Sequence, residues 1–482
     1  MRNIKKFAAA VVVSALVAVP VFAARGSANF TTFVALGDSY GAGFESGSLN
    51  QNHQVWSWPA VIARQVGLQL CPSNATATSA CWAQPLVSFP GLGPEVQLAG
   101  IIPTASFAAA PGSGQPLMTT FARPYNNLSI PGATVGALLT LTGAETPTAG
   151  EPTAVSMARF ILRGQGTAVQ QALAQHPTFI ALWIGGNDYL NVVFSGNPAT
   201  VTSAADFKTR YEALLDTLIA GAPNAGMVVG NLPSSIPPYL KLVAPFLINP
   251  ATGQPVPNPF TGGGPIYYMV DTGNGTQAPI APTTLIPLQT RDKLAQGYGI
   301  PAFLKTTAPF SSLPHTGEPL SQNDVITAEE IATVIARVGE FNAIIQQAAS
   351  ARNIPVADIA GLFARATSPT GIQLGPINVN GAPVSGGFFS YDFIHLTDLG
   401  YLLFGNEFIK AINAGYGTEI PLASITQLFA NNGAFFGDNG IGASALNFNG
   451  SNVGITDSAL AQISSFWALP APAPRHLRAV TH

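Results

Sequence analysis

Short apolar runs recur at long intervals along the chain, and each is rich in residues that favour β-structure. The first run ends at Gly37 and the second ends in a pair of glycines, which is typical of buried strands that stop at a sharp turn. We therefore predict four strands, at residues 31–36, 178–184, 226–230 and 354–359.

Stretches with a helical pattern lie between and after these runs. Thr327 and Glu330 form the pattern of a capping box, in which each side chain satisfies a backbone N–H at the start of a helix. The repeated order of strand and helix predicts a mainly parallel sheet covered by helices. Helices are predicted at residues 56–66, 135–141, 206–220 and 327–351.

Two long stretches rich in proline and glycine separate the predicted elements. They cover residues 67–123 and 233–324, and neither shows a sustained period. We expect irregular insertions there, because loops this long are uncommon in compact domains and are usually functional when present. Beyond residue 415 the chain is rich in glycine, asparagine and alanine, and its role is open.

Composition narrows the class of protein. Hydrophobic residues make up 47% of the 482 residues and charged residues only 9%, so a large core is available and charge-driven disorder is not expected. The formal net charge of −3 gives no basic patch. We therefore expect no nucleic-acid partner.

The first residues have the pattern of a secretory signal peptide. Arg2, Lys5 and Lys6 form a positive region, and residues 7–19 are mostly apolar. We predict cleavage near Ala23 and a secreted or periplasmic protein. An uncleaved anchor remains the alternative, although the apolar run is shorter than the ~20 residues of a spanning helix. No later segment is a convincing membrane span.

The chain has two cysteines, Cys71 and Cys81. An exported protein keeps disulfides, and an even count fits one local bridge. Two free thiols are the alternative. A metal site at the pair is not expected, since no further cysteine and no histidine lies nearby.

Ser39 directly follows the first predicted strand, within the sequence Gly-Asp-Ser-Tyr-Gly. Backbone N–H groups converge at a strand-to-helix turn, and the helix dipole there favours developing negative charge. A serine that only caps a helix is the alternative. The pattern also fits the nucleophile elbow of α/β-hydrolases. Against that, no strand–helix unit and no oxyanion loop precede it.

Asp392 and His395 lie three residues apart and can face each other across one turn. That spacing suits a base whose tautomer is fixed by an acid. A surface aspartate and a capping histidine are the alternative. His53 and His315 lie in loop-like stretches, and of the histidines in the expected fold only His395 has an acidic partner at a useful spacing.

Two further positions are candidates for contacts with a substrate oxygen. Asn187 follows a pair of glycines at the end of the second predicted strand, where its side-chain N–H can reach a negatively charged oxygen. Gly132 can bring a backbone N–H close to substrate. Plain turns are the alternative at both positions.

These stretches occur in an order that resembles the four sequence blocks of the GDSL or SGNH hydrolase family. The resemblance implies that Ser39 is the nucleophile, His395 the general base and Asp392 the residue that orients the imidazole. It also implies an oxyanion hole made by the N–H groups of Ser39 and Gly132 and the side chain of Asn187. One departure is a leucine at position 396, where many members have proline.

The resemblance further implies an α/β fold, a three-layer α/β/α sandwich with a parallel sheet of about five strands. The expected organisation is a signal peptide at 1–23, a hydrolase domain at 31–412 with the two insertions, and an extension of unknown role at 413–482. No cofactor and no metal are expected, and the oligomeric state is open.

The function that follows is an exported esterase or lipase acting on a small-molecule or lipid ester. Acyl transfer by the same residues, and a non-catalytic surface-binding protein on this scaffold, remain alternatives. Apolar groups of the second insertion, among them Leu240, Phe246 and Tyr267, are expected to form the wall of a groove for an acyl chain. Packing elsewhere in the domain is the alternative.

Overall fold

The structure is a computed structural model that describes residues 24–430 and 454–455, apart from residues 101–105, 196, 235–236, 242, 250–251, 274, 288–289 and 376. The predicted signal peptide and most of the predicted extension lie outside the described residues.

Four parallel strands form the centre of the molecule, in the order β1-β4-β5-β8. The first three are buried along their whole length, which explains why they read as continuous apolar runs. All four predicted strands are therefore confirmed. Their bounds are β1 Phe33–Gly37, β4 Phe179–Trp183, β5 Gly226–Gly230 and β8 Val356–Ala357.

A further extended segment continues the sheet beyond β1. The N–H of Ala35 donates to the carbonyl of Asn126 at 2.9 Å, and Leu128 and Ile130 donate back to Ala35 and Gly37 at the same distance. The segment pairs with β1 in parallel around Asn127. It occupies the fifth position of the sheet expected from the family resemblance.

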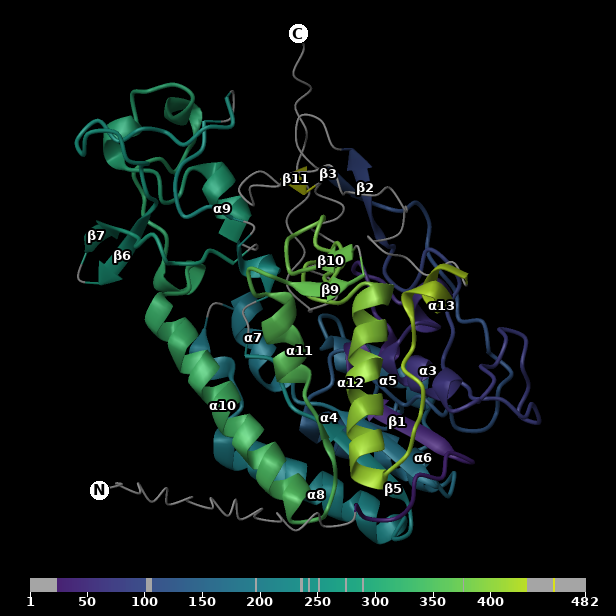
Figure 1. The fold of residues 1–482 in the computed structure, drawn as a ribbon. Helices are drawn as coiled ribbons and strands as arrows, with labels where there is room; N and C mark the ends of the chain where they lie inside the picture. The colour runs from purple at the N-terminus through teal and green to yellow at the C-terminus, as the bar shows by residue number, and fades with distance from the viewer. Residues whose placement is uncertain are drawn as a thin grey trace, which may run out of the picture.

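Helices cover both faces of the sheet, so the three-layer α/β/α arrangement is confirmed (Figure 1). Helix α10 begins with the predicted capping box, because Thr327 accepts from the N–H of Glu330 and the Glu330 carboxylate accepts from Thr327. One face carries α3 (Trp58–Gln65), α11 (Ile359–Ala366) and α12 (Asp398–Tyr416). The other carries α4 (Val135–Thr140), α6 (Ala168–Leu173), α8 (Ala204–Gly221) and α10 (Ala328–Ser350).

The first insertion is more regular than expected. It contains an antiparallel hairpin of β2 (Val96–Gly100) and β3 (Ser106–Ala109), so the prediction of an irregular segment is wrong there. These strands are rich in Ala and Gly and have little intrinsic β-preference. Tertiary packing explains the hairpin, since Phe107 is fully buried against residues that follow in the chain.

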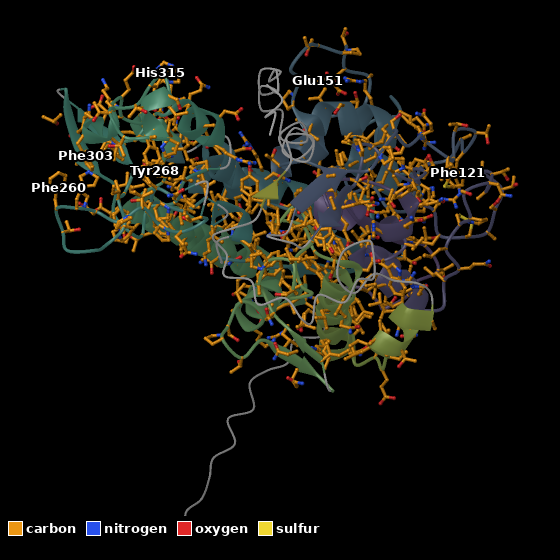
Figure 2. The ribbon with its side chains drawn as sticks, turned by 90° about the horizontal axis from the view of Figure 1, so that it is seen from above. Phe121, Glu151, Phe260, Tyr268, Phe303 and His315 are labelled. Carbon is orange, nitrogen blue, oxygen red and sulfur yellow. A yellow bond between two sulfur atoms is a disulfide. The ribbon has the colours of Figure 1, made fainter. Side chains whose placement is uncertain are left out.

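The second insertion forms a lobe beside α10, seen at the upper left in Figure 1. It contains the antiparallel pair β6 (Met269–Gly273) and β7 (Thr276–Pro279), and α9 (Arg291–Gln296). Its apolar residues form two small clusters of their own. In the view from above, the labelled Phe260 and Phe303 lie on this lobe, on the opposite side of the molecule from Phe121 (Figure 2).

The remaining elements are short. The helices are α1 Ser39–Ala42, α2 Gln51–Gln54, α5 Thr153–Leu162, α7 Asn187–Ser195 and α13 Ile425–Ala430, and the strands are β9 Ile372–Leu374, β10 Ile377–Val379 and β11 Gly454–Ile455. The 3-10 helices are η1 Pro198–Thr200, η2 Pro238–Lys241, η4 Ala302–Leu304, η5 Phe310–Ser312 and η6 Gln322–Asp324.

Candidate active site

Ser39 lies at the turn between β1 and α1, as the sequence predicts. It is the first residue of α1, and the carboxylate of Asp38 caps that helix by accepting from the N–H of Tyr40 at 3.1 Å. The turn is tightly packed, because a Cβ added at Gly41 would lie 2.2 Å from the Ser129 hydroxyl. Glycine at this position therefore allows the segment that carries Ser129 to approach closely.

The side chain of His395 joins Ser39 to Asp392. Its Nε2 lies 2.8 Å from Ser39 Oγ, and its Nδ1 lies 2.7 Å from Asp392 Oδ2. All three side chains are buried. Serine and histidine are 356 residues apart in the sequence, so only the fold brings them together.

The Asp392 carboxylate is held by several donors. Oδ1 accepts from the N–H groups of Ile394 and His395 at 2.9 and 2.8 Å, and Oδ2 accepts from the N–H of Gly47 at 2.9 Å. Burial alone would raise the pKa of this carboxyl. The electrostatic interaction and the side-chain hydrogen bond with the His395 imidazole, together with the backbone N–H groups of Ile394 and His395, lower its pKa below the ordinary value of 3.8.

The turn from Asp392 to His395 depends on an unusual backbone conformation. Phe393 has a φ of 61°, in the left-handed region that few residues other than glycine adopt. Both insertions contact this residue. The N–H of Tyr239 donates to the Phe393 carbonyl at 3.2 Å, and the ring of Phe107 packs edge-on against the Phe393 ring. Tertiary contacts thus maintain a strained turn at the site.

Aromatic rings border the imidazole of His395. The ring centroids of Tyr40 and Phe44 lie 5.3 and 4.8 Å from it. The Tyr40 hydroxyl donates to the carbonyl of Ile394 at 2.6 Å. These contacts restrict rotation of the imidazole.

Asn187 begins α7, directly after β4. Its side-chain Nδ2 donates to the carbonyl of Ala133 at 2.9 Å, and that residue follows Gly132 in the chain. Gly132 has a φ of 80°, a conformation that favours glycine. Asn187 and the turn at Gly132 are thus tied together, while Ser39 and Asn187 follow the carboxyl ends of the adjacent strands β1 and β4.

Two other acids are buried beside these residues, and the sequence gives no sign of their unusual state. Burial raises the pKa of Asp38 to about 8, and the nearby carboxyl of Asp188 contributes. Burial also raises the pKa of Asp188 to about 6, although the Val135 N–H and the Thr202 hydroxyl donate to it. Asp38 is therefore mainly neutral at pH 7.

The sequence places His53 in a loop-like stretch with no acidic partner at a useful spacing, and the structure contradicts that. It lies in α2 and contacts carboxylate oxygens of Glu45, Glu95 and Asp398. No local spacing reveals this group, since Asp398 is 345 residues from His53. Within the described residues, Glu45, His53 and Asp398 are the group whose ligand atoms lie close enough together to hold a metal ion.

A small apolar groove of about 30 Å³ lies between α7, the start of the second insertion and α10. Leu240 contributes to its wall as expected. Phe246 and Tyr267 do not line this groove, and their rings instead pack edge to face against each other within the lobe. The other lining residues are Tyr189, Val192, Ser234, Pro237, Ile326, Ile331, Val334, Ile335 and Val338.

The class of protein follows from a three-layer α/β/α fold with a serine, a histidine and an aspartate in line at the carboxyl end of its sheet. The model of the GDSL-like lipase/acylhydrolase family matches residues 33–408. The chain therefore belongs to that family and is a carboxylic ester hydrolase.

Several solved structures are similar to the chain at low sequence identity. A phospholipase A1 from Streptomyces albidoflavus NA297 is 14% identical with a TM-score of 0.30, over 81% of this chain and 100% of that one. A family 3 carbohydrate esterase from Clostridium thermocellum is 13% identical with a TM-score of 0.30, over 79% and 96%. An extracellular lipase from Streptomyces rimosus is 13% identical with a TM-score of 0.30, over 80% and 98%.

No curated protein matches the chain. None of the helices in the described part of the chain has the length and apolar character needed to cross a bilayer.

Proposed function

We propose that the protein is a secreted serine esterase or lipase that cleaves carboxylic esters through Ser39, His395 and Asp392 and forms an acyl-enzyme. The observation that carries this proposal is the continuous relay from Ser39 Oγ through both ring nitrogens of His395 to the Asp392 carboxylate. A hydroxyl is a weak nucleophile unless a base lies within hydrogen-bond reach, and this arrangement supplies one.

In the acylation step, Ser39 Oγ attacks the ester carbonyl and transfers its proton to His395 Nε2. Asp392 accepts the Nδ1–H, which fixes the tautomer and stabilises the imidazolium. Negative charge develops on the carbonyl oxygen, where the N–H groups of Ser39 and Gly132 and the amide of Asn187 are the proposed donors. The C–O bond to the alcohol then breaks, and His395 returns the proton to the leaving oxygen.

Deacylation repeats these roles with water as the nucleophile. His395 removes a proton from the water, which attacks the acyl carbonyl. The same donors stabilise the second tetrahedral intermediate, and Ser39 is released with its proton restored from His395. A carboxylic acid leaves, so the balance is one ester and one water to one acid and one alcohol.

The decisive experiment is a comparison of Ser39→Ala and His395→Ala with the native enzyme on a soluble p-nitrophenyl ester. Each variant is expected to lose about 10⁶-fold in kcat, the scale seen when a nucleophile or base of such a relay is removed. Circular dichroism checks that the fold is retained. Mass spectrometry of an acid-quenched reaction is expected to find the acyl group on the Ser39 peptide. Near-native activity of Ser39→Ala would overturn the mechanism.

Export is the second part of the proposal. It rests on the positive N-terminal residues, the apolar run after them and the small residue at Ala23. The Cys71–Cys81 disulfide suits an oxidising compartment. N-terminal sequencing of the protein recovered from culture medium or periplasm tests it, and an intact N-terminus in the cytoplasmic fraction would contradict it.

A further inference from the structure

His53 binds three carboxylates at the centre of a buried cluster. Its Nε2 lies 2.8 Å from Glu95, and its Nδ1 lies 3.0 Å from Asp398 and 3.2 Å from Glu45. None of the four side chains is more than 5% exposed. The three acids come from different parts of the chain, namely the loop after α1, the first insertion and the start of α12.

The contacts define the charge of this histidine. An ionised carboxylate can only accept a hydrogen bond, and both ring nitrogens of His53 lie beside carboxylate oxygens, so we assign both ring protons and a positive charge to this histidine. The guanidinium of Arg64 is a further positive charge that acts on Asp398. Removing the imidazolium would leave three buried carboxylates close together, and their repulsion would push the three segments apart.

One of these segments leads directly to the proposed catalytic acid. The two residues after Glu45 donate backbone hydrogen bonds to the turn that carries Asp392. The N–H of Ser46 donates to Ser390 Oγ at 3.0 Å, and the N–H of Gly47 donates to Asp392 Oδ2 at 2.9 Å. That oxygen also accepts from His395 Nδ1. The position of Glu45 therefore sets the position of a donor to Asp392.

A second segment leads to the proposed base. Asp398 is the first residue of α12 and lies three residues after His395. Because His53 contacts Asp398 and Glu45 with the same nitrogen, it fixes the distance between α12 and the loop that donates to Asp392. We infer that His53 is a positioning residue that holds Asp392 in register with His395. This inference rests on the proposed function.

The test is His53→Gln, which keeps one amide donor but removes the charge. We expect kcat on a soluble short-chain ester to fall about 10- to 100-fold, the scale of a small misplacement of catalytic groups, with KM changed by less than about twofold. The decisive measurement repeats the substitution in an Asp392→Ala background. If His53 acts through Asp392, it causes no further loss there, because the two effects are not additive.

The matched control is Asn406→Ala on α12, the helix that begins at Asp398. Asn406 is buried and bonds Ala423 in both directions, so its removal should lower the melting temperature while leaving kcat per active site unchanged. A titration with a covalent phosphonate counts the active sites in each variant. An unchanged kcat in His53→Gln, or an equal loss with and without Asp392, would overturn the inference. If Asp392→Ala itself keeps native activity, the proposed function is refuted instead.

If His53→Gln does not fold, Glu45→Gln replaces it. That variant keeps the contacts of His53 with Glu95 and Asp398. It weakens only the link to the loop whose Gly47 N–H donates to Asp392. We expect kcat to fall about threefold or more in the native background and not to fall further in the Asp392→Ala background. If kcat stays unchanged in the native background, the inference is overturned. Elemental analysis checks the charge assignment, since one tightly bound metal ion per chain would show that Nδ1 is a ligand and not a donor.

Discussion

The orientation of the Asn187 amide can be settled by its contacts. The carbonyl of Ala133 can only accept a hydrogen bond, so the atom 2.9 Å from it must be Nδ2 and not Oδ1. One N–H of the amide is used in this contact. The second N–H is the one that we propose donates to the oxygen of a bound ester, at the place where charge develops.

Asn187→Ala is therefore expected to lower kcat by roughly 10²- to 10³-fold, with a much smaller change in KM. The donor stabilises the oxygen more once it is charged than in the bound ester. Steady-state kinetics on a soluble ester measure both constants. A raised KM with native kcat would show that Asn187 binds substrate or shapes the turn.

Asp38 predicts a limit to activity at alkaline pH. Its pKa of about 8 in the fold means that it ionises as the pH rises through 8, in the residue that precedes Ser39 and caps the helix that Ser39 begins. A buried negative charge there opposes the developing oxyanion, so kcat should fall. Asp38→Asn should keep the cap and extend the active range toward pH 9–10. An identical alkaline limb in the variant would exclude Asp38 as its cause.

The Asp38 carboxyl also makes the free energy of unfolding depend on pH, and the protein is expected to lose stability as the pH rises. Its folded pKa of about 8 lies above the ordinary 3.8, so the folded state binds a proton that the unfolded state releases between these values. The stabilisation is fully present below pH 4 and is lost as the pH rises through 8. Urea unfolding should therefore show a smaller loss of stability from pH 6 to 9 in Asp38→Asn than in the native protein.

Residue by residue, the sequence predicted the groups whose signal is local. Ser39 follows an apolar strand, and Asp392 and His395 lie one turn apart, so short windows contain them. The partners of His53 and the neutral state of Asp38 depend on burial and on contacts across the whole chain. A pattern within ten residues cannot contain that information.

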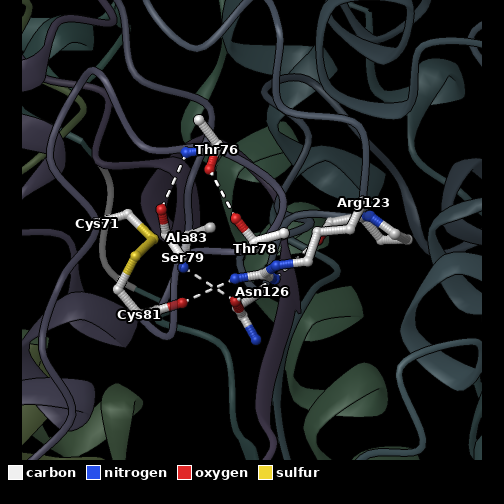
Figure 3. The surroundings of a disulfide bond; sticks show 9 residues. Cys71, Thr76, Thr78, Ser79, Cys81, Ala83, Arg123 and Asn126 are labelled. Carbon is white, nitrogen blue, oxygen red and sulfur yellow. Dashed lines mark hydrogen bonds between the residues drawn. A yellow bond between two sulfur atoms is a disulfide. The ribbon is translucent and has the colours of Figure 1, made fainter.

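At the scale of elements, the disulfide joins the two ends of one short loop at the amino end of β1. Cys71 and Cys81 are ten residues apart, and Arg123 donates to the Cys81 carbonyl and to the Asn126 side chain (Figure 3). The indole of Trp82 donates to the carbonyl of Phe33 at the start of the strand. The loop therefore lies at the end of β1 opposite the one that Ser39 follows.

Replacing both cysteines by serine should lower the free energy of unfolding by about 2–3 kcal/mol, the chain-entropy value for a loop of this length. Activity at 25 °C should stay within about twofold of native, because Ser39 lies beyond the other end of β1. Urea unfolding and ester hydrolysis measure the two quantities. A loss of kcat without a loss of stability would contradict this assignment.

Elements were predictable where they carry their own pattern. The buried strands read as apolar runs, and α10 has a capping box at its start. The hairpin of β2 and β3 was missed because its residues have little β-preference, and its packing partner Phe393 lies far along the chain. The lobe of the second insertion was missed for the same reason, since its core forms among residues spread from Leu247 to Val325 in loop-like sequence.

At the scale of the whole molecule, the groove between α7 and α10 lies next to the proposed site. Tyr189 and Pro237 line both this groove and a smaller cavity that Tyr40 also lines, and Tyr40 follows Ser39. The groove is almost entirely apolar. We therefore propose that it takes the end of an acyl chain that extends away from the serine.

Filling the groove should shorten the acyl chains that the enzyme accepts. Val334 on α10 lines it, and Val334→Trp would occupy the space that the distal methylenes need. Burial of each methylene contributes about 0.8 kcal/mol, so an octanoyl ester that lost four such contacts should react roughly 200-fold more slowly, while an acetyl ester keeps its rate. Ile344→Trp, also partly buried on α10 but outside the groove, is the matched control.

The measurement is kcat/KM for p-nitrophenyl esters from acetyl to decanoyl. Equal loss at every chain length in Val334→Trp would mean that the substitution damages the fold, and an unchanged profile would mean that the acyl chain binds elsewhere.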